Sequence, residues 1–318
     1  MNVLITGATG FVGSAVVHKL CEGRKVYAAV RMPVSFLPKK VEQVVIGDLL
    51  ADTDYTKALK NIDVVIHAAA RVHIMDDHAA DPLTEFRKVN VNGTLNLAKQ
   101  AAQAGVKRFV FISSIKLNGE TTTGKPPFSP SDSYITTDPY GLSKYEAEQG
   151  LFQIAKETGL EVVIIRPPLI YGVGVKANFR KLIETIDKGI PLPLGSVHNK
   201  RSLVALDNLV DFIGLCASHP KAAGEVFLIS DGEDVSTTEL LQKVGRALGK
   251  PARLLPVPVG LMRFVAKLLG KADVAERLFG SLQVDSSKAR DLLGWKPVVS
   301  MDEQLAKTME AYRHETTV

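Results

Sequence analysis

The sequence predicts an α/β protein in which a doubly wound parallel sheet is joined to a smaller, mainly helical C-terminal lobe. Short apolar runs alternate with helix-length segments through the first half of the 318 residues. The first of these runs leads directly into a glycine-rich turn, and prolines become frequent after about residue 170. Alternating strands and helices are typical of a parallel sheet with helices on both faces, and the later change of rhythm indicates the second lobe.

Seven apolar runs are predicted to be the strands of the sheet. Most are nearly continuous in Val, Ile and Ala, as expected for strands that are buried on both faces. The seventh lies far along the chain and is expected to return to the sheet. The predicted strands are residues 2–6, 25–30, 42–47, 63–68, 108–113, 161–166 and 225–230.

Helices are predicted between these strands and in the second lobe. The amphipathic stretch 257–271 is among them, and we expect it to cover its own domain rather than to contact a membrane or a partner. We expect a first domain over residues 1–170, rejoined by 203–231, and a second lobe that takes up most of 171–318. The other predicted helices are residues 11–22, 81–104, 139–158, 176–188, 237–248 and 284–293.

Composition limits the expected partners and compartment. The net charge is +5, but Lys and Arg form no run of five and are not interleaved with aromatic residues, so we expect no nucleic-acid partner. Cys21 and Cys216 are the only cysteines and stand far apart, which argues against a disulfide framework and suits a cytoplasmic location. No apolar run approaches the ~18 residues of a membrane span, and we expect no signal peptide before the first strand.

The stretch "TGATGFVG", residues 6–13, indicates a binding site for a dinucleotide. Gly7 permits a tight turn, Gly10 lets the backbone approach a pyrophosphate, and Gly13 lets the following helix pack closely. The N-terminus of that helix offers N–H groups and a partial positive charge to the phosphates. The first residues of the helix, Phe11 and Val12, complete the cofactor contacts predicted for this turn.

The end of the second predicted strand bears on which dinucleotide is bound. An acidic residue there would bind the ribose 2′-hydroxyl of NAD, whereas Arg31 can pair with the 2′-phosphate of NADP. A charge-assisted hydrogen bond contributes about 1.5–3 kcal/mol, which is roughly a ten- to hundredfold preference. We therefore expect NADP, with tightly bound NAD as the alternative.

The stretch "YGLSK" places Tyr140 and Lys144 one helical turn apart on one face of a predicted helix. Free tyrosine titrates near pH 10, which is too high for proton exchange at neutral pH. An ammonium ~4 Å away, at an effective dielectric constant near 20, contributes about 4 kcal/mol and lowers the phenol pKa by about three units. Burial opposes part of this shift. We predict that Tyr140 exchanges a proton with a substrate oxygen while hydride moves to or from the carbon.

These motifs, in this order and spacing, resemble the short-chain dehydrogenase/reductase superfamily, and in particular its extended, nucleotide-sugar-modifying branch. The resemblance runs over nearly the whole chain. It is carried by "TGATGFVG", "GDL" (47–49), "HAAA" (67–70), "NVNGT" (90–94), "FISS" (111–114), "YGLSK" (140–144), "RPPLIYG" (166–172) and "LGWKP" (293–297).

The resemblance implies roles for residues outside the glycine turn. It implies that Ser114 hydrogen-bonds the reacting oxygen, and Ser114 is preferred to Ser113 because the family's glycine, here Gly119, lies five positions further on. It also implies that Asp48 lies near the adenine and Pro167 near the nicotinamide. The remaining implied cofactor contacts are Leu49, Ala68, Ala69, Asn90, Ser113, Tyr140 and Lys144.

The residues after Ser114 exclude two reactions of this branch. Its dehydratases carry an Asp-Glu pair directly after the hydroxyl residue, where this chain has Ile115 and Lys116. No cysteine or histidine stands at those positions for 3,5-epimerisation. Asn118 occupies the place of the family's tyrosine.

The resemblance also implies how a UDP-sugar is held. Asn178, before a second-lobe helix, and Arg201, before a returning strand, match the diphosphate contacts of the branch, and a guanidinium suits bidentate phosphate binding. The segment "PLPLG" (191–195), with Leu192, resembles the edge segment that lies along the uracil. Arg277 is a second phosphate candidate, although the Gly-x-Asp that follows this arginine in the family is missing.

Two redox outcomes fit this set of residues. A 4-epimerase keeps NAD bound, oxidises C4 and reduces it again from the other face, whereas a 4-keto reductase consumes NADPH once. Because of Arg31, and because the chain looks closest to bacterial polysaccharide-pathway proteins, we favour NADPH-dependent reduction of the C4 keto group of a UDP-4-keto-6-deoxy-N-acetylhexosamine. An NAD-dependent UDP-hexose 4-epimerase is the alternative. A sensor that binds NADP without turnover is a remote one.

The resemblance alone implies a homodimer, formed through the predicted helices 81–104 and 139–158. We expect His67 to pack at the end of its strand rather than to act as a base. We expect no metal site. The polar residues after the fourth strand, expected to form a solvated loop, are His73, Asp76, Asp77 and His78.

Overall fold

The structure, a computed structural model, describes residues 1–72, 81–132 and 136–317. Its centre is a seven-stranded sheet with the order β3-β2-β1-β4-β5-β6-β9, and every neighbouring pair is parallel. The doubly wound parallel sheet is therefore confirmed, including the late run that returns to its edge. The strands are β1 (Asn2–Thr6), β2 (Lys25–Val30), β3 (Glu42–Val45), β4 (Val64–His67), β5 (Arg108–Ile112), β6 (Glu161–Arg166) and β9 (Val226–Leu228).

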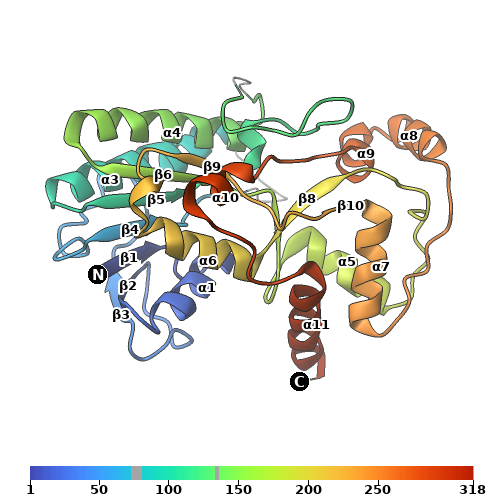
Figure 1. The fold of residues 1–318 in the computed structure, drawn as a ribbon, viewed down its shortest axis with the longest axis horizontal. Coiled ribbons are helices and arrows are strands. Elements are labelled where there is room, and N and C mark those ends of the chain that lie inside the picture. The colour runs from blue at the N-terminus through green and yellow to red at the C-terminus, as the bar shows by residue number, and fades with distance from the viewer. Residues whose placement is uncertain (73–80, 133–135, 318) are drawn as a thin grey trace.

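Helices cover both faces of this sheet (Figure 1). α1 (Phe11–Leu20) and α6 (Leu206–Cys216) pack on one face, and α3 (Thr94–Gln103) and α4 (Pro139–Thr158) pack on the other. Successive residues of each strand are buried in opposite cores, which explains why the strands are almost continuously apolar.

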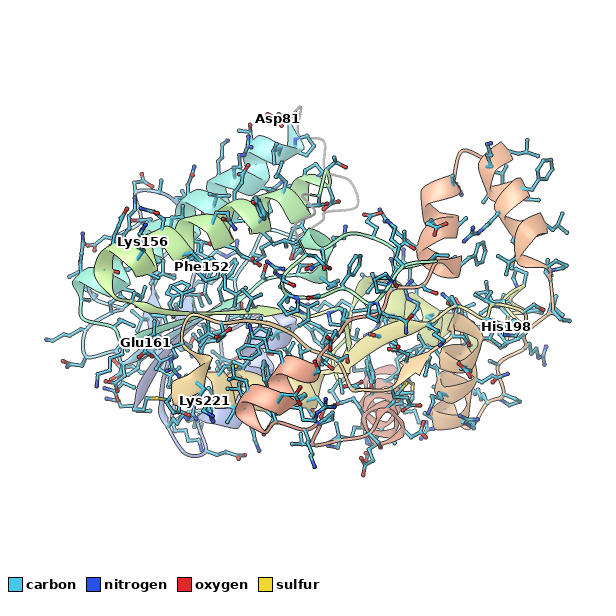
Figure 2. The ribbon with its side chains drawn as sticks, turned by 45° about the horizontal axis from the view of Figure 1, so that its top comes forward. Asp81, Phe152, Lys156, Glu161, His198 and Lys221 are labelled. Atoms are coloured by element: carbon cyan, nitrogen blue, oxygen red, sulfur yellow. The ribbon has the colours of Figure 1, made fainter. Side chains whose placement is uncertain are left out.

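Local signals fix the bounds of α4, the helix that carries the predicted catalytic pair. The helix spans Pro139–Thr158, as predicted, and Figure 2 labels two of its side chains, Phe152 and Lys156. The Asp138 carboxylate caps the N-terminus, and proline occupies the first helical position. Gly159 ends the helix in the left-handed conformation, with a φ of 77°.

The predicted helix 81–104 forms, but with a wide turn in its middle. It consists of α2 (Pro82–Phe86), the π-helix η1 (Arg87–Gly93) and α3. A Cβ on Gly93 would overlap the carbonyl oxygen of Leu49. The π-helix therefore lies directly against the segment that follows β3, which lines the cleft described below.

The second lobe contains a small three-stranded sheet with the order β10-β8-β7, which the sequence analysis missed. Its strands are β7 (Leu169–Tyr171), β8 (Arg201–Ala205) and β10 (Asp234–Val235), and runs of two to five residues carry little periodicity. The lobe's helices are α5 (Ala177–Asp187), α7 (Thr237–Leu248), α8 (Val259–Leu268), α9 (Ala272–Phe279) and α11 (Met301–Thr317).

A later segment of the chain returns to the first domain. α10 (Ser287–Leu293) and the following Trp295 contribute to the core beneath α1 and α6. Two short 3₁₀ turns complete the elements of the first domain, η2 (Ile115–Leu117) after β5 and η3 (Pro220–Ala222) before β9.

The helix expected over 257–271 forms as α8, but only one side of it covers its own lobe. Val259 and Met262 pack against the lobe's core. The opposite side is exposed and apolar. Within the described ranges, no helix has both the length and the apolar character needed to cross a bilayer.

His67 packs at the end of β4, as expected. Its side chain is buried, with Nδ1 2.6 Å from the Thr6 hydroxyl and Nε2 2.9 Å from the Thr94 hydroxyl. Its ring stacks on Phe111 at a centroid distance of 5.7 Å. Burial, and to a lesser extent the charge of Lys144, lower the pKa of His67 to about 3.

We expect His67 to make the fold acid-labile. The unfolded chain binds a proton at His67 below about pH 6.5, whereas the folded chain binds it only below about pH 3. The free energy of unfolding therefore falls as the pH is lowered from about 6.5 to about 3. His67→Gln removes the titration and keeps a donor and an acceptor. Urea unfolding at about pH 7 and about pH 4.5 should show the wild type losing roughly 2–3 kcal/mol more than the variant. Equal losses would contradict the assignment.

We expect Gly93→Ala to destabilise the fold by about 1–3 kcal/mol, because its methyl group displaces the backbone at Leu49. Gly23→Ala is the matched control, since nothing lies within 4 Å of a Cβ built there. Urea unfolding of both variants measures the difference. Indistinguishable midpoints would show that the π-helix tolerates a side chain at this contact.

Candidate active site

The glycine turn joins β1 to α1 with the geometry that its sequence predicts. Gly7 has a φ of +69°, and a Cβ on it would lie 2.6 Å from the backbone nitrogen of Ala69. The N–H of Gly10 donates to the carbonyl of Gly7 at 2.8 Å, which closes the turn. A Cβ on Gly13 would overlap that same carbonyl oxygen. The turn, the strand end after β4 and the start of α1 are therefore packed backbone to backbone.

A cleft of about 540 Å³ opens above this turn at the carboxyl ends of the strands. That is where open parallel sheets bind ligands. The cleft also includes Arg71 and Val89, which the sequence analysis did not single out. The predicted cofactor residues that line it are Gly7, Gly10, Arg31, Asp48, Leu49, Ala68 and Ala69.

The residues present fit a dinucleotide. The floor of the cleft is glycine backbone without side chains, and the N-terminus of α1 provides N–H groups for phosphates. Phe11 and Val12 differ from the expectation, because their side chains pack against the core beneath α1. Only their backbone remains at the helix N-terminus. A larger hollow of about 860 Å³ lies beyond Phe11 between α1 and α6, and none of the predicted catalytic residues lines it.

Arg31 and Asp48 face each other across the rim of the cleft. Nη1 of Arg31 lies 3.7 Å from Oδ1 of Asp48, and the two side chains are 79% and 69% exposed. An exposed pair of this kind contributes little to stability. The pair does place the Asp48 carboxylate beside the Arg31 guanidinium, and the expectation of NADP rests on that guanidinium.

Lys144 is buried in the second turn of α4. Its ammonium donates to the carbonyl of Ile112 at 2.8 Å and lies 4.3 Å from the centroid of the Phe111 ring. Burial lowers the pKa of Lys144 to about 7, and the nearby carboxylate of Glu148 opposes that shift. Lys144 is thus poised between its charged and neutral forms near neutral pH.

The pKa of Tyr140 shifts in the opposite direction from that expected. Burial, and then the charge of Asp138, raise the pKa of Tyr140 to about 12. Its ring packs edge-on against Phe86 at 5.8 Å. The expectation considered Lys144 alone. In the structure the Lys144 ammonium is drawn to the end of β5, and the carboxylate that caps α4 lies close to the phenol. At neutral pH Tyr140 is therefore a protonated phenol.

The two serines after β5 have different surroundings. The hydroxyl of Ser113 is buried and donates to Oε1 of Glu148 at 2.5 Å, so its proton is committed to a carboxylate. Ser114 is only partly buried, and its Oγ accepts a long bond of 3.3 Å from the N–H of Lys116. This difference supports Ser114 as the hydroxyl that contacts a substrate. The Ser113 hydroxyl can then only accept a further hydrogen bond, and its backbone N–H already donates to the carbonyl of Ile165 at 2.8 Å.

Glu148 is the site residue that the sequence analysis missed. Its fully buried carboxylate accepts from two nitrogens of Arg166 at 2.6 and 3.0 Å. Arg166 also donates to Oδ1 of Asn118 at 3.1 Å, and Asn118 donates to the carbonyl of Ser129 in the long loop. An acidic residue one turn beyond Lys144 on the buried face of α4 was the signal that could have found it.

Asn90 and Pro167 support the site from either side. Asn90 is buried in η1, where it accepts from the N–H of Arg71 at 2.8 Å and donates to the hydroxyl of Ser143 at 3.0 Å. It therefore ties the cleft wall to α4. The carbonyl of Pro167 accepts from the N–H of Ile115 at 3.1 Å, which holds Pro167 next to Ser114.

The structure brings together two of the four predicted substrate residues. Nη1 of Arg201 donates to the carbonyls of Arg277 and Gly280 at 2.8 and 3.2 Å, and burial lowers the pKa of Arg201. Asn178 is exposed on the first turn of α5. Leu192 lies in a parallel bridge with Leu254.

The possible metal ligands of the loop after β4 lie outside the described residues. Over 1–72, 81–132 and 136–317, no group of three or more His, Cys, Asp or Glu side chains is arranged to hold a metal ion. The excluded residues are His73, Asp76, Asp77 and His78.

Known proteins match this fold and these motifs over almost the whole chain. The chain is 51% identical to a UDP-glucose 4-epimerase of Vibrio cholerae over 314 residues, covering 98% of this chain and 95% of that protein. The crystal structure of the UDP-glucose 4-epimerase of Thermotoga maritima with UDP-glucose has a TM-score of 0.76 and 25% identity, and covers 99% of this chain and 100% of that one. The structure of MoeE5 in complex with UDP-glucose and NAD has a TM-score of 0.77 and 26% identity, with the same coverage.

A family model also matches the part of the chain that holds the sheet, the cleft and the predicted catalytic pair. The matched residues are 3–230, and the model describes the NAD dependent epimerase/dehydratase family. The chain therefore belongs to this family, within the extended short-chain dehydrogenases/reductases, and is an NAD(P)-dependent nucleotide-sugar enzyme.

Proposed function

We propose that the protein is a UDP-hexose 4-epimerase that works with bound NAD. The observation that carries this proposal is its high identity, over nearly its full length, to an enzyme of that name. The sequence analysis favoured a 4-keto reductase, mainly because Arg31 can pair with the 2′-phosphate of NADP. Asp48 opposite Arg31 weakens that argument, since its carboxylate repels a phosphate at the same place.

In this proposal the chain moves a proton while the cofactor carries the hydride. A nicotinamide bound in the cleft would supply the hydride chemistry, accepting hydride from C4 of the sugar and returning it. Ser114 hydrogen-bonds the C4 oxygen. Tyr140, which is protonated in the protein without cofactor, would lose its proton when the positive charge of a bound oxidised nicotinamide lowers its pKa, and would then accept the C4 hydroxyl proton and give it back. The charged form of Lys144 stabilises the phenolate. Glu148 keeps part of Lys144 in that form, because its carboxylate opposes the lowering of the lysine pKa.

We propose that the UDP moiety lies in the second lobe. Arg201 and Arg277, joined at the junction of β8 and α9, provide the guanidinium groups for the diphosphate. Leu192 provides an apolar edge for the uracil, and Asn178 contributes from the N-terminal turn of α5. With the UDP moiety held there, the sugar would point towards the N-terminal end of α4, where Tyr140 lies.

We expect Tyr140→Phe to reduce turnover by at least about a hundredfold, because the proton then has no carrier at C4. Dinucleotide binding should persist, since the cleft residues are unchanged. Tyr145→Phe, five residues further along α4, is the matched control. Interconversion of UDP-glucose and UDP-galactose measures turnover, and fluorescence titration measures binding. Unchanged turnover in Tyr140→Phe would refute the assigned chemistry, and a wild type that binds dinucleotide without turnover would point to the sensor.

The dinucleotide released by denaturing the purified protein separates the two redox outcomes. We expect close to one NAD per chain, because an epimerase regenerates its cofactor in every cycle and keeps it. A site that is purified empty and takes up NADPH would instead support the 4-keto reductase. Arg31→Ala should leave NAD retention unchanged if the proposal holds, whereas a reductase would lose NADPH affinity by roughly ten- to a hundredfold.

A further inference from the structure

The helix α8 is turned with its apolar stripe towards solvent. Phe264 is 61% exposed and Leu268 is 71% exposed, although both are large apolar residues. The positions follow the spacing i, i+3, i+4, i+7 and i+8, which defines one continuous helix face. The residues of this stripe are Leu261, Phe264, Val265, Leu268 and Leu269.

The neighbouring helix α9 extends the same apolar surface. Its exposed Val274 and Leu278 lie one turn apart, and α8 and α9 pack against each other through an ion pair between Arg263 and Glu276 at 3.2 Å. We call the exposed apolar residues of α8 and α9 the hairpin face. Figure 1 shows the two helices at the extreme end of the second lobe, and Figure 2 shows their side chains projecting from that end. An exposed contiguous apolar surface marks an interaction site.

The charges around the hairpin face indicate what it contacts. Residues 257–271 contain Arg263, Lys267 and Lys271 but no Asp or Glu, whereas α9 carries Asp273 and Glu276, and Glu276 is paired with Arg263. A short helix with Leu and Phe on one face and only basic residues among its charges is suited to the headgroup region of an anionic bilayer. At 10 residues α8 is too short to span a membrane, so it would lie in the plane of the surface.

We propose that the hairpin face docks the protein on an anionic lipid surface, with the apolar stripe in the headgroup region and Lys267 and Lys271 at the lipid phosphates. The two helices lie at the end of the second lobe, away from the seven-stranded sheet (Figure 1), which leaves them free to approach a surface. The homodimer contact expected from the sequence involves residues 81–104 and 139–158, and α3 and α4 within these ranges belong to the first domain, away from α8 and α9 (Figure 1). The hairpin face is therefore separate from that contact.

This docking goes beyond the proposed function and adds a location to it. α9 carries Arg277, whose carbonyl accepts from Arg201, so the proposed diphosphate residues lie at the base of the docked hairpin. The enzyme would then take its nucleotide-sugar at the membrane surface.

Vesicle co-sedimentation of the full chain tests the proposal. We expect the protein to bind vesicles of phosphatidylcholine with about 30% phosphatidylglycerol and to bind pure phosphatidylcholine at least about tenfold more weakly. Binding to the anionic vesicles should weaken in high salt, because the basic residues are exposed. The double variant Phe264→Glu with Leu268→Glu should lose binding by at least about tenfold. Lys267→Glu with Lys271→Glu should lose it on the anionic vesicles only.

A matched control keeps the test decisive. Val298→Glu introduces the same charge at a 56% exposed apolar residue outside the hairpin face and should bind like the wild type. Urea unfolding shows whether each variant is folded. Because the test measures vesicle binding, its result does not depend on the enzymatic activity. Absence of wild-type binding, or equal binding by Phe264→Glu with Leu268→Glu, would overturn the proposal. A third outcome would also overturn it: the wild type does not bind vesicles but self-associates, and Phe264→Glu with Leu268→Glu abolishes that self-association. The hairpin face would then bind a second copy of the chain.

Discussion

The carboxylate of Glu148, fully buried between α4 and the sheet, accepts hydrogen bonds from Arg166 of β6 and from Ser113 at the end of β5. A buried carboxylate that lacks partners costs several kcal/mol or takes up a proton, so α4 can dock only where both strands present these donors. Lys144 lies one turn earlier on the same helix, so the anchoring of Glu148 also fixes the position of Lys144. Through Asn118 the same arginine also reaches the long loop. One ion pair thus positions the catalytic helix against two strand ends and a loop.

The same carboxylate sets the electrical balance of the site. Burial pushes the pKa of Lys144 down and Glu148 pulls it up, and the result near neutrality lets a small change in the surroundings alter the charge of the lysine. Tyr140 experiences the opposite sign, because Asp138 lies close to its phenol. The pKa values of Tyr140 and Lys144 therefore depend on two acids that cap and anchor α4. Neither acid needs to touch the substrate.

Much of the fold and part of the site follow from sequence pattern. The strands of the parallel sheet are predictable because both of their faces are buried, and α4 is predictable from Asp138, Pro139 and Gly159. The small second sheet is not, because its strands are too short for a period to show. The sign of the Tyr140 pKa shift was wrong, since spacing reveals the nearby lysine but not the burial or the capping acid. The homodimer and the cytoplasmic location remain predictions.

The segment 281–285 runs between the long loop and β8, and its backbone is bonded to both. Thr122 and Phe128 donate to its carbonyls on one side, and Ser202 donates to it on the other. The long loop, which holds the hydrogen-bond partners of Asn118, and β8, which starts at Arg201, are thus both hydrogen-bonded to residues 281–285. A displacement of the loop would therefore be transmitted through residues 281–285 to the start of β8, where Arg201 lies. The long loop and β8 therefore share one backbone support, and the position of each constrains the position of the other.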